Sequence, residues 1–449
     1  MKTNNHLFLL LISFSFLSIN QIAAQNPFSH TFGDDLLGEK GIASVQLTDG
    51  SIYMLGNNSQ DITLTKLDEN GTEIWQKEYG TDYYDYANNI LLVDENNFVI
   101  AGETYHSPTA NLDGLLIKVD ADGNEIWQKQ HGSTTANESL YSIDKTLTNG
   151  FVTCGFISGS EGTTGNDILV MVFDENGEVI WQKSYGTDLN EVGVAVCADE
   201  NGEYIISCDK QKFGAFTYNV YVFKVDNQGD MLWEMNVYNE NNGGCKNMKP
   251  NSKGNFVIVG EMTTPTSLYF DAYMLEVTSD GDLLLEKQIE GTDNGDAVFD
   301  VIEVEGNRYL LTGYTYNPEK QQTDIGVWLV DAFGNELDKR YYGNEAYDIS
   351  YDIIPSNSGG YLVTGASFTN ANDQYILISD TAFPITNVSE NQLQSKNLAA
   401  TKLFPNPITS NNLTVFFDEK IEKATAKLFD INGKLCWQTA IETDFSSLT

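Results

Sequence analysis

One phrase recurs along the chain at a nearly constant interval, and this interval limits what the chain can fold into. The phrase reads DENGTEIWQKEYG from Asp68, DADGNEIWQKQHG from Asp120 and DENGEVIWQKSYG from Asp174. Four tryptophans and two later residues mark the column at intervals of 52 to 54 residues: Trp75, Trp127, Trp181, Trp233, Leu285 and Asp338. A fixed period of this length indicates a fold built from repeated units.

Each repeat contains four short runs that read as β-strands. In the second repeat these runs are YANNILLV, FVIAGETY, DGLLIKVD and EIWQKQHG, and they show alternation and β-branched residues without a helical period. The second run ends in glycine in most repeats, where strands converging on a crowded axis leave no room for a side chain. These glycines are Gly102, Gly155, Gly260, Gly313 and Gly365. Four strands in about 52 residues predict one blade of a β-propeller.

The columns of the repeat differ in number. The closing run occurs six times, whereas the third run opens seven times, with Asp61, Asp113, Asp167, Asn219, Asp271, Asp324 and Asp373. The unit that ends at Asp380 lacks a closing run, and the segment NPFSHTFGDD near the N-terminus resembles one. We therefore expect an all-β fold with a seven-bladed β-propeller over residues 25–380, in which the N-terminal strand closes the last blade and removes an exposed edge.

Residues 1–24 are typical of a secretory signal peptide. They contain Lys2, an apolar stretch from Leu7 to about Ile19 and small residues at Ala23 and Ala24. No later stretch approaches the roughly 18 consecutive apolar residues of a membrane span. We expect a protein that is secreted or held at the outer cell surface, without a transmembrane helix.

Charge and cysteine content narrow the function classes. The chain has 64 Asp and Glu against 25 Lys and Arg, a net charge of -39, which repels phosphate backbones and disfavours a nucleic-acid partner. Cys154 and Cys208 lie in apolar runs and are expected to be buried thiols, while a bridge between Cys197 and Cys208 is the alternative.

The blade text resembles the β-propeller repeats of exported proteins of the Bacteroidetes type, over nearly the whole of the propeller. After a polar linker at residues 381–401, the segments KLFPNPITS and LFDINGKLCWQ resemble the C-terminal sorting domain of the type IX secretion system. The matching positions are Pro405, Asn406, Pro407, Gly433 and Lys434. The resemblance implies a small β-sandwich at 402–449 with the type IX secretion machinery as partner. Because the family pattern continues beyond Thr449, we expect either a truncated domain or an incomplete sorting signal.

The recurring phrase has three interpretations. Asp120, Asp122 and Asn124 alternate as oxygen donors, which suits calcium, but the bidentate Glu of a calcium loop is missing. Trp127 would suit a glycan platform if it were exposed. A hairpin turn, with Asp capping and Gly in a left-handed conformation, explains every version of the phrase. We therefore expect a turn and an outer strand, and no cofactor, with calcium left open.

No catalytic constellation stands out. The mature chain has three histidines, His30, His106 and His131, without a zinc-binding spacing. Its two arginines, Arg308 and Arg340, are too few for the carboxylate clamp of a sialidase.

One acidic column survives as a candidate ligand site. It precedes the innermost strand of most blades and consists of Glu39, Asp85, Glu138, Glu191, Asp296 and Asp348. These carboxylates would form a negative ring at the channel mouth that binds a cation or a basic ligand, or each would cap its own loop. The sequence predicts a non-catalytic binding or structural module with a possible glycan or protein ligand on the blade loops. The alternative is a carbohydrate-active enzyme that uses the carboxylates of the channel mouth.

Overall fold

The computed structural model of the chain describes residues 28–32, 39–106, 111–159, 165–214, 217–237, 242–264, 267–289, 295–343, 347–357, 359–368 and 373–380, and then the strands of a C-terminal unit. All regular elements in these residues are β-strands. The chain divides into two compact units, one of which extends from Ile22 to Pro384. Within the described part of the chain, no helix has the length and apolarity needed to cross a membrane.

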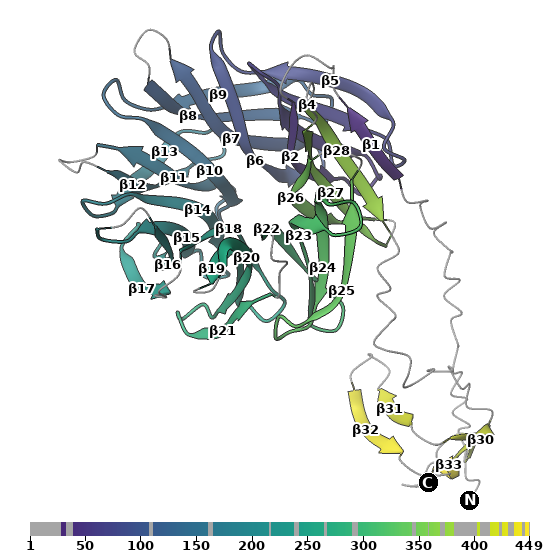
Figure 1. Cartoon of the computed structure of the whole chain (residues 1–449). Helices are drawn as coiled ribbons and strands as arrows, with labels where there is room; N and C mark the ends of the chain where they lie inside the picture. The colour runs from purple at the N-terminus through teal and green to yellow at the C-terminus, as the bar shows by residue number, and fades with distance from the viewer. Residues whose placement is uncertain are drawn as a thin grey trace, which may run out of the picture. The chain divides into compact units, whose positions relative to one another are not determined.

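Six antiparallel sheets each consist of four strands that follow one another in the chain, and we call them blades 1 to 6 (Figure 1). Blade 1 contains β2 (Lys40–Gln46), β3 (Ile52–Asn57), β4 (Ile62–Leu67) and β5 (Glu73–Tyr79). Blade 2 contains β6 (Tyr84–Asp94), β7 (Asn97–His106), β8 (Asn111–Asp120) and β9 (Glu125–His131). Blade 3 contains β10 (Glu138–Lys145), β11 (Phe151–Ser158), β12 (Asn166–Phe173) and β13 (Val179–Tyr185). Blade 4 contains β14 (Glu191–Ala198), β15 (Tyr204–Gln211), β16 (Tyr218–Val225) and β17 (Met231–Val237). Blade 5 contains β18 (Gly243–Pro250), β19 (Phe256–Thr264), β20 (Ser267–Val277) and β21 (Leu283–Gln288). Blade 6 contains β22 (Asp296–Val304), β23 (Arg308–Asn317), β24 (Gln322–Val330) and β25 (Glu336–Tyr342).

A further sheet joins the two ends of this unit, and we call it the closing sheet. Its strands are β26 (Tyr347–Pro355), β27 (Tyr361–Phe368), β28 (Asp373–Asp380) and β1 (Phe28–Phe32), in the order β1-β28-β27-β26. Phe28 pairs with Ser379 and Phe32 with Tyr375, so the N-terminal segment supplies the outer strand, as the sequence predicts.

The first strands of the sheets are neighbours in a closed series: β2, β6, β10, β14, β18, β22, β26 and again β2. The described strands of this unit therefore form a β-propeller, with these innermost strands arranged around a common axis (Figure 1).

The middle strands of the blades carry the core. All six residues of β3 are buried, as are seven of the eight residues of β12, whereas outer strand β5 is mostly exposed or half-buried. The middle strands therefore read as continuous apolar runs. A Cβ atom on Gly102 would collide with the main-chain oxygen of Tyr86 in the innermost strand. This close approach confirms the physical reason predicted for the glycine column.

The recurring phrase forms a turn that receives a tryptophan from the preceding blade. Asp120 Oδ1 accepts hydrogen bonds from the main-chain N–H groups of Asp122 (3.0 Å) and Asn124 (2.7 Å), and Gly123 has a φ of +74°. A Cβ on Gly123 would lie 2.6 Å from the Trp75 ring. The same contact recurs where Trp127 meets Gly177, Trp181 meets Gly229 and Trp233 meets Gly281. The phrase is thus the predicted turn, and its glycine is required both by the backbone angle and by the neighbouring ring.

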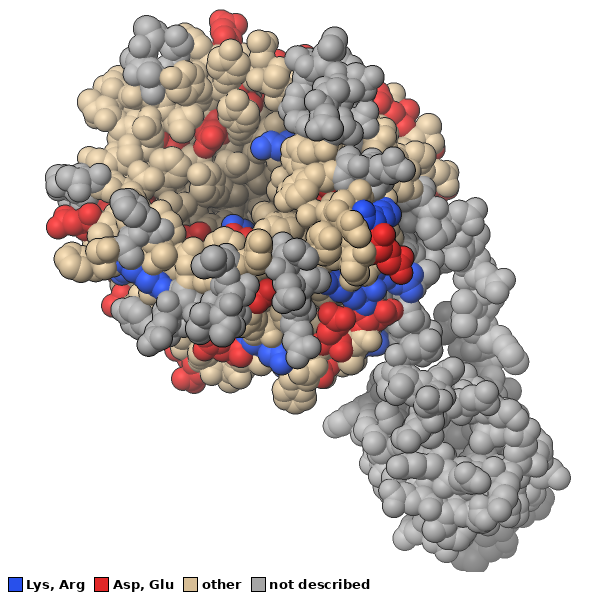
Figure 2. Space-filling model, in the orientation of Figure 1, with Lys and Arg blue, Asp and Glu red and all other residues tan. Residues whose placement is uncertain are grey.

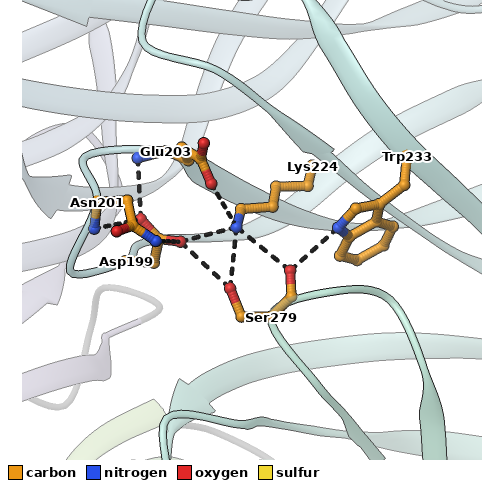
Figure 3. Close-up of polar contacts among 6 residues, drawn as sticks. All are labelled: Asp199, Asn201, Glu203, Lys224, Trp233 and Ser279. Atoms are coloured by element: carbon orange, nitrogen blue, oxygen red, sulfur yellow. Dashed lines mark hydrogen bonds and ion pairs between the residues drawn. The ribbon is translucent and has the colours of Figure 1, made fainter.

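A charged joint connects blades 4 and 5 (Figure 3). Lys224 of β16 forms ion pairs with Asp199 (2.8 Å) and Glu203 (2.6 Å), and donates a hydrogen bond to the main-chain oxygen of Ser279 (3.2 Å). The side chains of Lys224 and Asp199 are only 4% and 5% exposed. The indole N–H of Trp233 donates to the same Ser279 oxygen (3.1 Å). This network, which we call the Lys224 joint, ties blade 4 to the turn between β20 and β21.

The cysteines of the propeller are thiols. Cys154, Cys197, Cys208 and Cys245 are all free and buried, which confirms the buried-thiol prediction for Cys154 and Cys208. The alternative bridge between Cys197 and Cys208 is wrong, because these residues pair with Ile205 and Gly193 in the β14–β15 ladder rather than with each other.

The C-terminal unit contains two small sheets. Strands β29 (Lys402–Phe404), β30 (Thr414–Ile421) and β33 (Phe445–Leu448) form one, and β31 (Ala424–Phe429) and β32 (Leu435–Ile441) form the other. The predicted leader 1–24, the linker 381–401 and the sorting residues Pro405, Asn406, Pro407, Gly433 and Lys434 lie outside the described residues.

Candidate functional site

Each innermost strand carries one extra residue. The register between the first and second strands shifts at the same place in every sheet, for example between Gly41 and Ala43 in blade 1. Such a shift is a β-bulge, which bends the strand and redirects a side chain. We call the skipped residues the bulge residues: Ile42, Asn88, Tyr141, Val194, Lys246, Phe299 and Tyr351.

All of the bulge residues line one cavity of about 290 Å³. The polar side chains among its other lining residues are Ser44, Asn89, Asn247, Lys249 and Asp352. A hollow opens at the centre of the face shown in Figure 2, and its wall consists mostly of residues other than Lys, Arg, Asp and Glu. The bulges therefore build a pocket from side chains that are far apart in sequence.

Five aromatic rings form a continuous line into this cavity from blade 6 and the closing sheet. We call it the aromatic path, and it consists of Phe368, Tyr347, Tyr314, Phe299 and Tyr351. Successive ring centroids are 6.1, 6.4, 6.1 and 5.3 Å apart. Tyr347 is 43% exposed, and Phe299 and Tyr351 line the cavity. The path thus leads from an exposed ring to the cavity.

A lysine and two carboxylates flank the path. Lys246 forms an ion pair with Glu261 (2.9 Å), and its ammonium lies 5.6 Å from the centroid of the Phe299 ring. Burial opposes the charge of Lys246, but Glu261 and Asp209 raise the pKa of its ammonium above the ordinary value. Burial raises the pKa of Asp209 to about 6, although Lys246 and a hydrogen bond from the main-chain N–H of Cys245 (2.8 Å) act in the opposite direction.

A second ion pair lies at the cavity wall. Lys249 lines the cavity and is 3.6 Å from Asp300, whose other oxygen accepts a hydrogen bond from Asn247 (2.6 Å). Asp352 accepts hydrogen bonds from the main-chain N–H (2.8 Å) and hydroxyl (3.1 Å) of Ser44. Burial and the nearby Asp300 raise the pKa of Asp352 to about 7, against the effect of Lys249. A cavity-lining carboxyl is therefore partly protonated near neutral pH.

The acidic column lies outside the cavity wall. Its members each lie three residues before a bulge residue, and all are at most 5% exposed: Glu39, Asp85, Glu138, Glu191, Asp296 and Asp348. Asp85 accepts a hydrogen bond from the main-chain N–H of Thr81 (2.6 Å), and Glu191 accepts from the main-chain N–H (3.2 Å) and hydroxyl (2.5 Å) of Thr187. These bonds hold the loops that enter β6 and β14, as in the loop-capping alternative. The column is not among the residues that line the described cavity.

A second carboxylate lies near one member of this column. Burial raises the pKa of Glu138, and Asp113 raises it further, while Glu138 Oε2 has no hydrogen-bond partner. The counterpart of Asp113 in blade 6 is Asp324, and there a lysine is present: Lys320 lies 3.3 Å from Asp324 and donates a hydrogen bond to the main-chain oxygen of Gly343 (2.9 Å). Two carboxylates are fewer ligands than calcium takes. Over the described residues, no group of three or more His, Cys, Asp or Glu side chains is placed to hold a metal ion.

Sequence reasoning did not find the bulge residues, although a signal for them exists. Along an unbroken strand, buried positions alternate with a period of two. In the innermost strands this alternation breaks at the bulge: in β10, Leu140 and Ser142 are buried on either side of Tyr141, and Ile143 is buried directly after them. This change of phase places the bulge residue toward the cavity.

No protein-family model matches the chain, and no curated protein matches it. Among solved structures, the WD40 domain of Neurospora crassa Pan2 is similar with a TM-score of 0.47 and 11% identity, over 78% of this chain and 98% of that domain. Virginiamycin B lyase from Staphylococcus aureus, solved with quinupristin, has a TM-score of 0.48 and 8% identity, and the matched regions cover 79% and 99%. Polysaccharide lyase Uly1 gives the same values. At these identities the likeness concerns the propeller fold alone.

Proposed function

We propose that this protein is a non-catalytic binding module with a seven-bladed propeller, and that its ligand enters the central cavity. The observation that carries the proposal is the ring of bulge residues. In every innermost strand one residue is left out of the pairing with the next strand, and its side chain lines the same cavity. A site assembled on rigid strands suits recognition better than a site on loops.

The chemistry of the bulge residues supports the same conclusion. The repeat keeps one residue type at positions that build the blade, such as the turn glycines. The bulge position instead contains aliphatic, amide, aromatic and cationic side chains, represented by Ile42, Asn88, Tyr141 and Lys246. A position with a purely structural role would need only one type of side chain. A cavity wall whose residue type changes from blade to blade is what a specific, asymmetric ligand requires.

We also propose that the protein is exported and acts outside the cell or at its surface. The leader-like residues 1–24 and the resemblance of residues 402–449 to a type IX sorting domain support this location. The blade loops YHSPTANL, SGSEGTTGN and TTPTSLYF, parts of which lie outside the described residues, would add contacts for a large glycan or protein ligand.

One observation favours an enzyme as the second candidate. Asp352 lines the cavity and its pKa is raised to about 7, mainly by burial, which is the range expected of a general acid or base. A carbohydrate-active enzyme would use this carboxyl at the cavity wall. Turnover of a polysaccharide by the chain, and its loss in Asp352→Asn, would favour this candidate over the binding module.

The binding proposal is tested by closing the cavity. Val194→Trp places a large ring among the bulge residues, and Leu232→Trp adds the same ring on outer strand β17 of the same blade, where Leu232 is 49% exposed. We expect ligands from a combined glycan and peptide array to bind the wild type and Leu232→Trp, and to fail on Val194→Trp. Equal binding by both variants would show that the cavity is not the site.

A further inference from the structure

The aromatic path is specific to one sector of the ring. The residue that follows the second-strand glycine is Tyr314 in blade 6 and Phe156 in blade 3, but Asn57 in blade 1 and Glu103 in blade 2. Phe156 contacts only one further ring, Tyr141, among the ring pairs of the described residues, whereas Tyr314 belongs to a line of five rings. The bulge position is aromatic in blade 3, blade 6 and the closing sheet, and it is aliphatic or an amide in blades 1, 2 and 4. The path is therefore not a demand of the blade repeat, and a contiguous line of partly exposed rings marks a binding surface.

The charges beside the path are already neutralised in pairs. Lys246 is paired with Glu261 and Lys249 with Asp300. A charged ligand that binds a member of these pairs would have to break the pair and leave a buried charge uncompensated, which is costly. The remaining polar wall of the cavity contains the amides of Asn88, Asn89 and Asn247, the hydroxyl of Ser44, and the Asp352 carboxyl, which already accepts two hydrogen bonds from Ser44. The wall suits a ligand without net charge.

Amide and hydroxyl groups beside aromatic faces match the chemistry of sugars. A pyranose ring presents C–H groups on its faces and hydroxyl groups on its edge, so it can pack on Phe299 or Tyr351 while its hydroxyls bond to amides. Asn88 uses its Nδ2 to donate to the main-chain oxygen of Leu140 (3.1 Å), which leaves its Oδ1 as an acceptor for a hydroxyl. The net charge of -39 repels acidic sugars at long range.

We propose that the aromatic path and the cavity bind a neutral oligosaccharide, with one end of the sugar chain in the cavity and the following residues along the path. This inference rests on the proposed function, since it assigns the ligand class of the same site. A cavity of about 290 Å³ is at the small end for ligand pockets. It accommodates the end of a chain, and the line of rings to Tyr347 extends the contact outward.

The test uses the full chain and three neutral hexasaccharides: cellohexaose, laminarihexaose and mannohexaose. Hexagalacturonic acid and a lysine-rich peptide serve as charged comparators, and affinities are measured by calorimetry. We expect at least one neutral hexasaccharide to bind, and Phe299→Ala and Tyr351→Ala each to weaken it about 10-fold, the upper range for the loss of one ring contact. Phe333→Ala, which removes a ring that is 70% exposed in the β24–β25 turn of blade 6, should leave the affinity unchanged. Phe299→Leu keeps apolar volume without the ring face and replaces Phe299→Ala if that variant does not fold.

The outcomes separate the ligand class from the site. Absence of binding by all three neutral sugars at millimolar concentration overturns the inference. It is also overturned if a sugar binds Phe299→Ala and Tyr351→Ala as tightly as the wild type. If only the lysine-rich peptide binds, and Val194→Trp abolishes that binding, the proposed function stands and the sugar assignment fails. If Val194→Trp abolishes no binding, the proposed function itself is refuted.

Discussion

Substitution of Lys224 by Met tests how the Lys224 joint stabilises the propeller. The side chain of Asp199 is 5% exposed and that of Glu203 is 31% exposed. Asp199 is therefore the carboxylate that the substitution leaves buried without its charged partner. Removal of one member of a buried ion pair costs about 3–5 kcal/mol. Because Glu203 can turn to solvent, we expect Lys224→Met to lower the free energy of unfolding by about 3 kcal/mol, at the low end of that range.

Blade 2 provides a matched control. Lys118 occupies the equivalent place opposite Trp127, but its recorded hydrogen bond is a contact of 3.5 Å to the main-chain oxygen of Glu175 at the surface. Lys118→Met should therefore change the unfolding free energy by less than about 0.5 kcal/mol. Urea unfolding followed by tryptophan fluorescence measures both variants under the same conditions.

The penalty at Lys224 should depend on pH. Burial opposes the charge of Asp199, but the hydrogen bond from Lys224 and those from main-chain N–H groups keep its pKa below the ordinary value of 3.8. A lowered carboxyl pKa gives stability that is present above the ordinary pKa and is lost as the pH falls through the folded value. Without Lys224, hydrogen bonds such as those from the main-chain N–H groups of Asn201 and Glu203 are left to oppose the effect of burial, so Asp199 takes up a proton more readily. The loss should be largest at pH 7 and smaller near pH 4, and equal losses at the two pH values, or equal effects of the Lys224 and Lys118 substitutions, would refute the reasoning.

Three further predictions concern the turn, the closing sheet and the cavity. Gly123→Ala should destabilise the protein more than Gly254→Ala in urea unfolding. Both glycines have positive φ values, but the new Cβ would meet a tryptophan ring at Gly123 and open space at Gly254. Equal losses of unfolding free energy, each near the ~1–2 kcal/mol of backbone strain, would show that the ring contact is unimportant. Removal of residues 28–32 leaves the edge of β28 unpaired, so we expect self-association in size-exclusion chromatography, and an unchanged monomer would argue against closure by β1. Asp352 has a raised pKa of about 7 in the folded protein, so between about pH 4 and 7 the folded state holds a proton that the unfolded state has released. The contribution of Asp352 to stability therefore falls as the pH rises through this window. Asp352→Asn should reduce the fall of the unfolding free energy between pH 5 and pH 7.5, as measured by urea unfolding.

The architecture was predictable because each repeat depends on residues at fixed positions close together in the sequence. A turn requires Asp and Gly at fixed spacing, and the contact between blades requires a large ring such as Trp75 one strand later, so both leave a period in the sequence. Pairing of the N-terminal segment with β28 followed from counting columns, since an incomplete unit and an unassigned strand occur at opposite ends of the propeller.

The ligand site was less accessible to the same reasoning. The acidic residues were conspicuous as a column, yet Asp85 and Glu191 are buried and bonded to their own loops. The cavity wall depends on bulges that shift alternation by one residue, and no Gly or Pro marks Tyr141 or Phe299 as the skipped position. Which side chains meet at the cavity is decided by the closure of the ring, which no local pattern contains.

The pairing of β1 with β28 also sets the order of events when the chain is made. Phe32 leaves the ribosome long before its partner Tyr375, and at ordinary synthesis rates the interval is on the order of tens of seconds. Throughout this time the first strand has no partner, and the last sheet does not yet exist to seal the ring. The propeller is therefore a fold that cannot be finished from one end, and any factor that keeps the early chain extended until its final strand arrives would help it to mature.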